Sequence, residues 1–83
     1  MIPTETIQEI IKDLRESFEE EGVNADPLEY LREAYLMNSM GEEYILLARG
    51  EKAPCLMYDM NGEFVGIQPI SYAREECERC ELL

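Results

Sequence analysis

Residues 55–68 read CLMYDMNGEFVGIQ, and this stretch carries the strongest local structural signal in the chain. Asn61 and Gly62 stand between two short apolar segments, and both residue types tolerate the positive φ that a two-residue hairpin turn requires. We therefore predict an antiparallel hairpin whose register follows from the turn. One face, expected to be buried, pairs Met60 with Glu63, Tyr58 with Val65 and Leu56 with Ile67, and the other face carries Cys55, Met57, Asp59, Phe64 and Gln68.

A third strand is predicted just before the hairpin. Residues 44–47 read Tyr-Ile-Leu-Leu, a continuous apolar run of the kind found in a strand that is buried on both faces. Residues 50–54 are typical of the loop that follows it. This strand must pair beside the hairpin to complete a three-stranded antiparallel sheet, and the pattern leaves open which edge it joins.

A helix is predicted over the N-terminal residues as far as Gly22. Thr6 and Glu9 offer a capping box at its start, and Gly22 is a typical helix stop. Its apolar stripe recurs at helical spacing and consists of Ile7, Ile10, Ile11, Leu14 and Phe18.

A second helix is predicted from Asp26 to Met40, with Gly41 as its end. Asp26 is the expected N-cap, Pro27 takes the first helical position and Glu29 reaches back. Either this helix is buried on two sides, or part of it forms an exposed apolar patch of the kind found at interfaces. The two sides carry Leu28, Leu31 and Tyr35 on one and Tyr30, Ala34 and Met37 on the other, and the exposed patch would consist of Tyr30, Met37 and Met40.

A short third helix is predicted at the C-terminus. Pro69 ends the hairpin, Ser71 is a candidate N-cap, and one side of the helix carries Ala73, Cys77 and Cys80. The complete order predicts an α+β domain. In it, two N-terminal helices pack on one face of a three-stranded antiparallel sheet, followed by the short C-terminal helix.

Length and charge indicate one small acidic domain over residues 1–83. Nineteen acids, seven bases and no histidine give a formal charge of -12. An acidic surface repels phosphate backbones and anionic lipid headgroups, so we expect basic partners and no direct binding to nucleic acid or membrane. The chain begins without a positively charged leader, and we expect its three cysteines to be reduced thiols in the cytoplasm.

The sequence offers no catalytic or cofactor-binding signature. Without histidine there is no ordinary general base and no imidazole metal ligand, and no glycine-rich phosphate loop precedes a helix. Cys77-x-x-Cys80 is half of a metal or redox motif to which Cys55 could add a third thiolate, but a fourth ligand is missing. We expect these cysteines to be small packing residues, and we expect no enzyme, metal or cofactor.

The surface of the first helix carries the main functional signal. Opposite the apolar stripe lies a row of carboxylates, here called the acidic ridge, which consists of Glu9, Asp13, Glu16 and Glu20, with Glu5 and Glu19 beside it. Like charges at these spacings repel by roughly 0.2–0.5 kcal/mol per pair, and Lys12 and Arg15 offset only part of this cost. The ridge is either a solvated face that keeps the protein soluble or a surface that imitates a row of phosphates for a basic partner.

These observations favour a non-catalytic protein-binding module. Residues 1–43 carry twelve acids and three bases, so this half carries most of the net charge and favours a directed field. The leading hypothesis is an inhibitor or regulator that occupies the nucleic-acid site of a basic protein through the acidic ridge and Glu19, as small phage or mobile-element inhibitors do. The second is an interaction or homodimerisation subunit that docks through Tyr30 and Met37, and the third is a small metal or thiol module.

Overall fold

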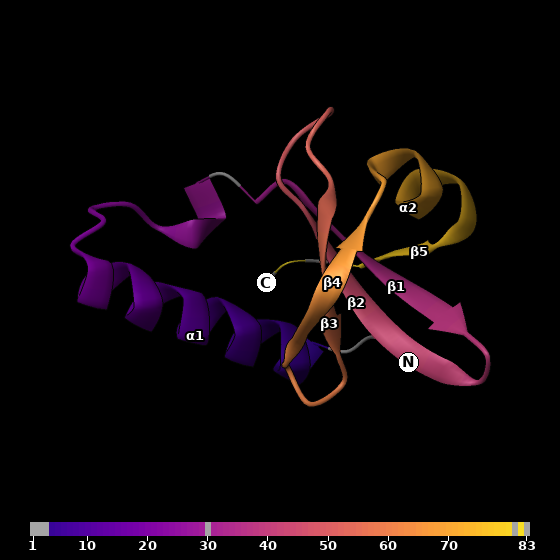
Figure 1. Ribbon diagram of the computed structural model, residues 1–83, viewed down its shortest axis with the longest axis horizontal. Helices are drawn as coiled ribbons and strands as arrows, with labels where there is room; N and C mark the ends of the chain where they lie inside the picture. The colour runs from indigo at the N-terminus through magenta and orange to yellow at the C-terminus, as the bar shows by residue number, and fades with distance from the viewer. Residues whose placement is uncertain (1–3, 30, 81, 83) are drawn as a thin grey trace.

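The computed structural model describes residues 4–29, 31–80 and 82. The strands form one antiparallel sheet in the order β4-β3-β2-β1-β5, and the described residues add two α-helices (Figure 1). This confirms the predicted α+β class, but the sheet has five strands and not the predicted three. In chain order the elements are α1 (Thr4–Glu21), the 3-10 turn η1 (Pro27–Glu29), β1 (Glu33–Ser39), β2 (Glu42–Ala48), β3 (Cys55–Asp59), β4 (Phe64–Gln68), α2 (Ile70–Glu76) and β5 (Glu78–Cys80).

The predicted second helix is wrong, because residues 33–39 form β1, which lies between β2 and β5. Successive side chains of this strand point to opposite faces of the sheet, which explains why the segment carries apolar residues on two sides. Ala34 and Leu36 contact the cluster under α1, whereas Tyr35 and Met37 belong to the cluster under α2. The segment is rich in helix-forming Ala, Leu, Met and Glu, so tertiary packing overrides local propensity here.

A two-residue turn joins β1 to β2 where the end of the predicted helix was expected. Met40 has a φ of 53° and Gly41 a φ of 82°, and positive φ at both central residues defines a type I′ hairpin turn. Only the start of the predicted helix is found, as η1. There Asp26 Oδ1 accepts a hydrogen bond from the Leu28 N–H at 2.9 Å.

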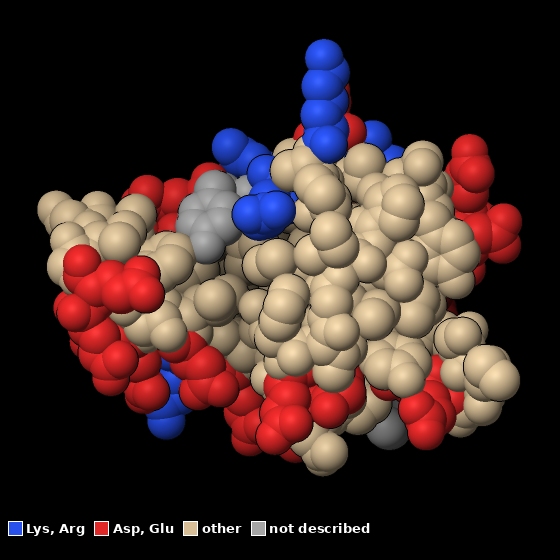
Figure 2. Space-filling model, in the orientation of Figure 1, with Lys and Arg blue, Asp and Glu red and all other residues tan. Residues whose placement is uncertain are grey.

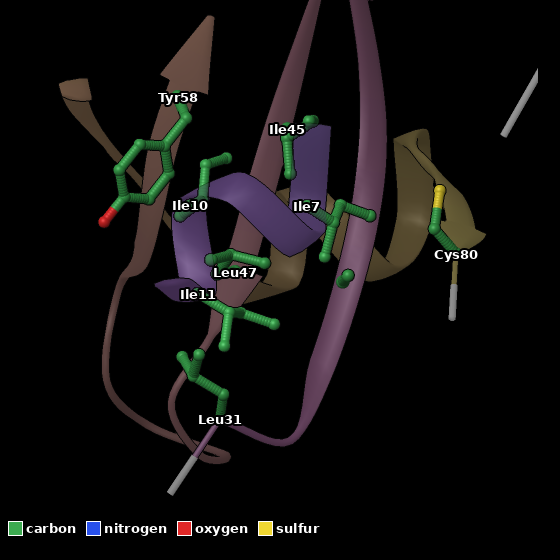
Figure 3. Packing of buried hydrophobic residues seen from close by; sticks show 9 residues of the cluster. Ile7, Ile10, Ile11, Leu31, Ile45, Leu47, Tyr58 and Cys80 are labelled. Carbon is green, nitrogen blue, oxygen red and sulfur yellow. The ribbon is translucent and has the colours of Figure 1, made fainter. Parts of the chain in front are cut away.

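The sheet carries one helix on each face, so the prediction that the two N-terminal helices cover one face is wrong. Residues 45–48 of β2 are all fully buried and alternate between the two faces, which confirms the predicted strand buried on both sides. On the α1 face the helix packs Ile7, Ile10 and Ile11 against Ile45, Leu47 and Tyr58 (Figure 3). On the α2 face Ala73 packs with Tyr35, Met37, Leu46, Ala48 and Cys55.

α1 confirms the first predicted helix and its end at Gly22. Gly22 has a φ of 74° and its N–H donates to the Glu19 carbonyl at 3.2 Å. The Val23 N–H donates to the Phe18 carbonyl at 2.8 Å. These two bonds form a Schellman motif, which satisfies carbonyl groups that the end of a helix leaves without partners.

The predicted capping box at the start of α1 is wrong. The helix begins at Thr4, so Thr6 lies inside its first turn. The Thr6 hydroxyl instead donates to the Met60 carbonyl at 3.5 Å. This contact places the N-terminal end of α1 beside the turn between β3 and β4.

The predicted hairpin is present, but its turn has three residues and not two. The Gly62 N–H donates to the Asp59 carbonyl at 3.0 Å, and the Asp59 N–H donates to the Glu63 carbonyl at 2.9 Å. Asp59, and not Met60, therefore pairs with Glu63. The Asp59 carboxylate also accepts the Asn61 N–H at 2.9 Å and the Glu63 N–H at 3.0 Å, and these local bonds favour the longer loop.

The longer turn shifts the register beside it. Leu56 faces Ile67 as predicted, whereas Tyr58 pairs with Phe64 and not with Val65. The ladder is irregular here, because Val65 is an extra residue that bulges out of β4. Tyr58 is buried as predicted, but Val65 is 45% exposed, so the predicted burial of Val65 is wrong.

The C-terminal residues form α2 and then a strand that the sequence analysis missed. Pro69 is the N-cap of α2 and makes no side-chain cap hydrogen bond, so the predicted cap at Ser71 is wrong. Cys77 packs with Ala73 in the cluster under α2, whereas Cys80 in β5 packs in the cluster under α1. The predicted shared side of Ala73, Cys77 and Cys80 therefore holds for Ala73 and Cys77 alone.

We expect Gly62→Val to destabilise the protein by about 1–2 kcal/mol, because a β-branched residue resists a positive φ. Gly62 has a φ of 84°, and an added Cβ would meet only Ile10 Cγ1 at 3.7 Å, so the strain comes from the backbone and not from crowding. Gly62→Asn is the control, since asparagine tolerates this conformation better. Urea unfolding measures both, and equal losses would show that the backbone conformation is not the cause.

Candidate functional site

α1 places the acidic ridge on its solvent side. Ile7, Ile10 and Ile11 of the apolar stripe are buried and Leu14 and Phe18 are partly buried, while the four ridge residues, Glu5 and Glu19 are all exposed. Figure 2 shows that the surface over α1, at the lower left, is mostly acidic. In the described part of the chain none of these six carboxylates takes part in an ion pair. The helix therefore brings together all the acids that the sequence analysis placed at the site.

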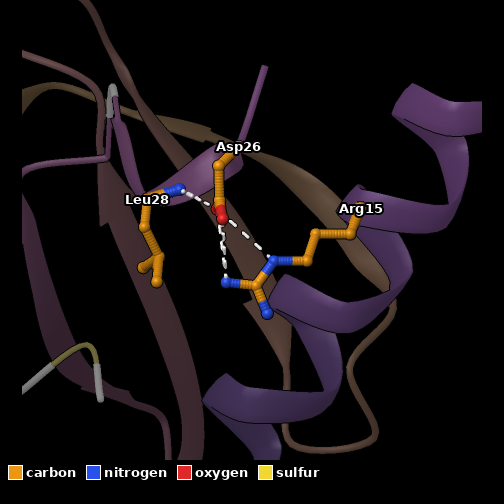
Figure 4. Close-up of polar contacts among 3 residues, drawn as sticks. All are labelled: Arg15, Asp26 and Leu28. Carbon is orange, nitrogen blue, oxygen red and sulfur yellow. Dashed lines mark hydrogen bonds and ion pairs between the residues drawn. The ribbon is translucent and has the colours of Figure 1, made fainter. Parts of the chain in front are cut away.

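Arg15 could neutralise part of this row but is engaged by Asp26, which lies in the segment that follows α1. Its Nη2 lies 3.2 Å from Asp26 Oδ2, and its Nε and Nη2 both donate to Asp26 Oδ1 (Figure 4). The hydrogen bond from the Leu28 N–H, followed by the contacts with Arg15, lowers the pKa of Asp26 below its ordinary value. Of the two bases on α1, Lys12 alone is left to offset the ridge.

The spacing of the carboxylates resembles that of phosphates on one DNA strand. Glu5 and Glu20 are separated by fifteen positions, which corresponds to about 22 Å along a helix that rises 1.5 Å per residue. Six carboxylates span this length in five intervals that average about 4.5 Å, against about 3.4 Å between successive phosphates along each strand of B-DNA. A basic groove that accepts a nucleic-acid strand could therefore accept this helix.

Several bases lie away from the ridge, at the end of the sheet where β1 begins and β2 ends. The Arg32 N–H donates to the Ala48 carbonyl at 2.8 Å, which places Arg32 next to Arg49. Arg74 of α2 lines the same hollow as Arg32, and its Nη2 lies 2.9 Å from Glu33 Oε1. Figure 2 shows Lys and Arg gathered at the top of the view. Glu33 and Glu51 line the same hollow, but the bases gathered here lie away from the ridge, which favours a directed field over a uniform one.

A second candidate surface, which the sequence analysis missed, lies along β4. Within the described sheet β4 is an edge strand with β3 as its one neighbour. Phe64, Val65 and Ile67 are 58%, 45% and 58% exposed, although Val65 and Ile67 were expected in the core. In Figure 2 a broad uncharged area covers the centre of this face, with acids along its lower border. We call β4 with these three side chains the β4 edge.

A hollow of about 450 Å³ adjoins the C-terminal end of the β4 edge. Its apolar lining comes from both sides of the β4–α2 junction, so an apolar side chain of a partner would find contacts on several sides. The lining consists of Pro54, Ile67, Pro69 and Ile70, together with Glu51, Lys52, Gln68 and Ser71.

The three cysteines do not form one cluster. Cys55 and Cys77 lie in the cluster under α2, and Cys80 lies on the opposite face of the sheet. Burial is the main cause that raises the pKa of each of the three thiols, so all three favour the protonated form. Across residues 4–29, 31–80 and 82 no three Cys, Asp or Glu side chains converge as metal ligands would.

The predicted apolar docking patch of the second helix is not formed. Met37 is 5% exposed and faces the interior under α2, because residue 37 lies in β1. Tyr30 lies outside the described residues. Met40 is fully exposed, but it stands in the β1–β2 turn and not on a helix face.

No protein-family model, curated protein or solved structure matches this chain. In the described residues no helix combines the length and the apolar character that a membrane crossing needs.

Proposed function

We propose that this chain is a non-catalytic protein-binding module, and that its acidic ridge occupies the nucleic-acid site of a basic protein and so inhibits or regulates it. The observation that carries the proposal is the exposed acidic ridge with Glu5 and Glu19 beside it, six carboxylates whose average spacing along α1 is comparable to that of phosphates along a DNA strand. Such a row attracts a basic groove over a range of about 8 Å at physiological salt and speeds association.

The position of the acids supports binding over solubility alone. Acids scattered over the whole surface would keep the protein soluble without repelling one another at helical spacings. Glu19, Glu20 and Glu21 lie at the C-terminal end of α1, where negative charge opposes the helix dipole. The row destabilises the helix both by repulsion between like charges and by opposing the helix dipole. Binding to a basic partner would explain why these acids are present in spite of this cost.

The chemistry of the remaining side chains supports a role without catalysis. The chain has no histidine, and burial favours the protonated form of its three thiols. The proposed partner is a basic protein, such as an enzyme that acts on nucleic acid, and the free thiols suit the reducing cytoplasm. Direct binding of this chain to DNA or RNA forms no part of the proposal, because its own field opposes it.

The test compares two variants that carry the same net charge. The ridge variant changes Glu9, Glu16 and Glu20 to Gln and Asp13 to Asn, which moves the formal charge from -12 to -8 by removing four acids. The control variant removes four exposed acids elsewhere, by changing Glu43, Glu75, Glu76 and Glu78 to Gln. Each protein is immobilised and exposed to a lysate of the source cell, and the captured basic protein is purified for binding measurements with and without DNA.

We expect the ridge variant to bind the captured protein about tenfold or more weaker and with a smaller salt dependence, because four phosphate-like contacts are lost. We expect the control variant to stay close to the original chain, and DNA to compete with the original chain. The free energy of unfolding of the ridge variant should rise by roughly 1 kcal/mol, since like-charge pairs are relieved. Equal losses of affinity in both variants would show that net charge, and not the ridge, drives binding.

A further inference from the structure

The β4 edge has the properties of a strand that accepts another strand. β4 pairs with β3 on one side, so backbone N–H and C=O groups of alternate residues point away from the described sheet on the other. Its residues 64–68 carry no charge, and three of their side chains are exposed and apolar. Soluble proteins usually protect such an edge with charges, proline or a bulge. β4 carries no charge or proline, and its bulge lies at Val65, before Gly66–Gln68.

Backbone geometry limits how much of the edge can pair. The bulge at Val65 bends the strand, so regular pairing is expected over about three or four residues around Gly66–Gln68. Gly66 has no side chain, which lets another backbone approach closely. A docked segment would therefore be short, and it would need a side-chain contact in addition to backbone hydrogen bonds.

The hollow beside Ile67 supplies that contact. It lies where β4 meets α2, and Pro54, Pro69 and Ile70 complete its apolar lining. In strand addition, backbone hydrogen bonds provide affinity and pockets for alternate side chains provide specificity. An apolar residue of a segment paired with Gly66–Gln68 is within reach of this hollow.

Charge identifies the occupant. Glu63 directly precedes β4 and is exposed, and the Thr6–Met60 contact brings the N-terminal end of α1 close to the same turn. Basic residues at the end of the docked segment that passes Glu63 would thus lie near an acid, while Glu51 and Lys52 in the lining of the hollow offset each other. A second copy of this chain would bring another charge of -12 and is disfavoured by repulsion.

We propose that the β4 edge binds a short extended segment of the basic partner protein, in which basic and apolar residues alternate, as an added strand with an apolar side chain in the hollow. The inference rests on the proposed function in taking the same basic protein as the partner. It goes further in assigning a second contact, separate from the acidic ridge, and a conformation for the bound segment.

The test uses a blocked peptide of alternating lysine and valine as the probe, added to the nitrogen-15-labelled full chain. We expect amide shift changes at residues 64–68 and amide exchange there slowed by roughly tenfold or more, because added-strand hydrogen bonds protect edge amides. A peptide of equal charge with proline in place of valine lacks the donors for pairing and should not protect β4.

Two lysine variants separate the edge from the overall charge. Ile67→Lys places a charge on the β4 edge, and we expect it to weaken peptide binding by about tenfold or more. Val23→Lys makes the same charge change at an apolar residue that is 44% exposed beyond the end of α1, and should leave binding within about twofold. Equal effects of the two variants would overturn the proposal.

The remaining outcomes also decide between the two surfaces. Shift changes confined to α1, with the proline peptide equally effective, would overturn docking at β4 and leave the acidic ridge as the contact. Protection at β4 together with full affinity of the ridge variant for the partner would support docking and contradict the proposed function. A dimer by light scattering, with β4 amides protected before peptide is added, would overturn the proposal in favour of a second copy.

Discussion

Replacing Leu47 by alanine is expected to lower the free energy of unfolding by about 2–5 kcal/mol, and Leu46→Ala is expected to lower it by a similar amount. Both side chains are fully buried in β2, but Leu47 faces the cluster under α1 and Leu46 the cluster under α2. A domain of this size has a stability of roughly 4–12 kcal/mol, so either loss removes a large part of it.

Urea unfolding followed by circular dichroism measures both variants. Met40→Ala serves as the control, because Met40 is fully exposed and its truncation should change the stability by less than about 0.5 kcal/mol. A large loss for Leu47→Ala with none for Leu46→Ala would contradict the second helical layer. The paired result thus tests whether the sheet is buried on both faces.

The second large effect is expected at the β3–β4 hairpin. Tyr58→Ala should destabilise the protein by about 3–5 kcal/mol, whereas Val65→Ala should cost less than about 0.5 kcal/mol. Tyr58 is buried under α1 and its ring packs edge-on against Phe64 with centroids 5.7 Å apart. Val65 lies in the bulge and is 45% exposed.

Thermal unfolding of the two variants distinguishes the observed register from the two-residue turn predicted by the sequence. That turn sets Tyr58 and Val65 opposite each other on the buried face and therefore predicts losses of similar size. A Val65→Ala variant that loses as much stability as Tyr58→Ala would support the two-residue turn and contradict the observed register. Phe64→Ala, at 58% exposure, should fall between the two, since it loses the ring contact but little burial.

The hydrophobic pattern and the turn residues predicted those elements for which the pattern fits either a helix or a strand but not both. The stripe from Ile7 to Phe18 with a stop at Gly22 is helical, and α1 confirms it. The pattern of β1 has two interpretations, because a strand buried on both faces and a helix buried on two sides both place apolar residues at successive positions. β5 has three residues, which is too short for a period to show.

The acidic ridge could be predicted because it depends on one helix and its period. The exposed side of α1 follows from the buried side, so Glu9, Asp13, Glu16 and Glu20 needed no information about the sheet. The β4 edge could not be found in this way. Its apolar residues look like core residues in sequence, and their exposure depends on which strands occupy the neighbouring positions.

The acidic character follows from the composition. The first helix with its row of carboxylates, the strand within residues 44–47 that is buried on both faces and the presence of the hairpin could be predicted from residues close together in the chain. Three features could not be predicted in this way: residues 33–39 form a strand, Cys77 and Cys80 face opposite sides of the sheet, and β4 lies at the edge of the described sheet. These features depend on pairing between distant segments. In the folded protein, backbone groups pair with neighbouring strands and apolar side chains are buried against the rest of the sheet. Where this burial is larger, it overrides the local preference of a segment for helix or strand.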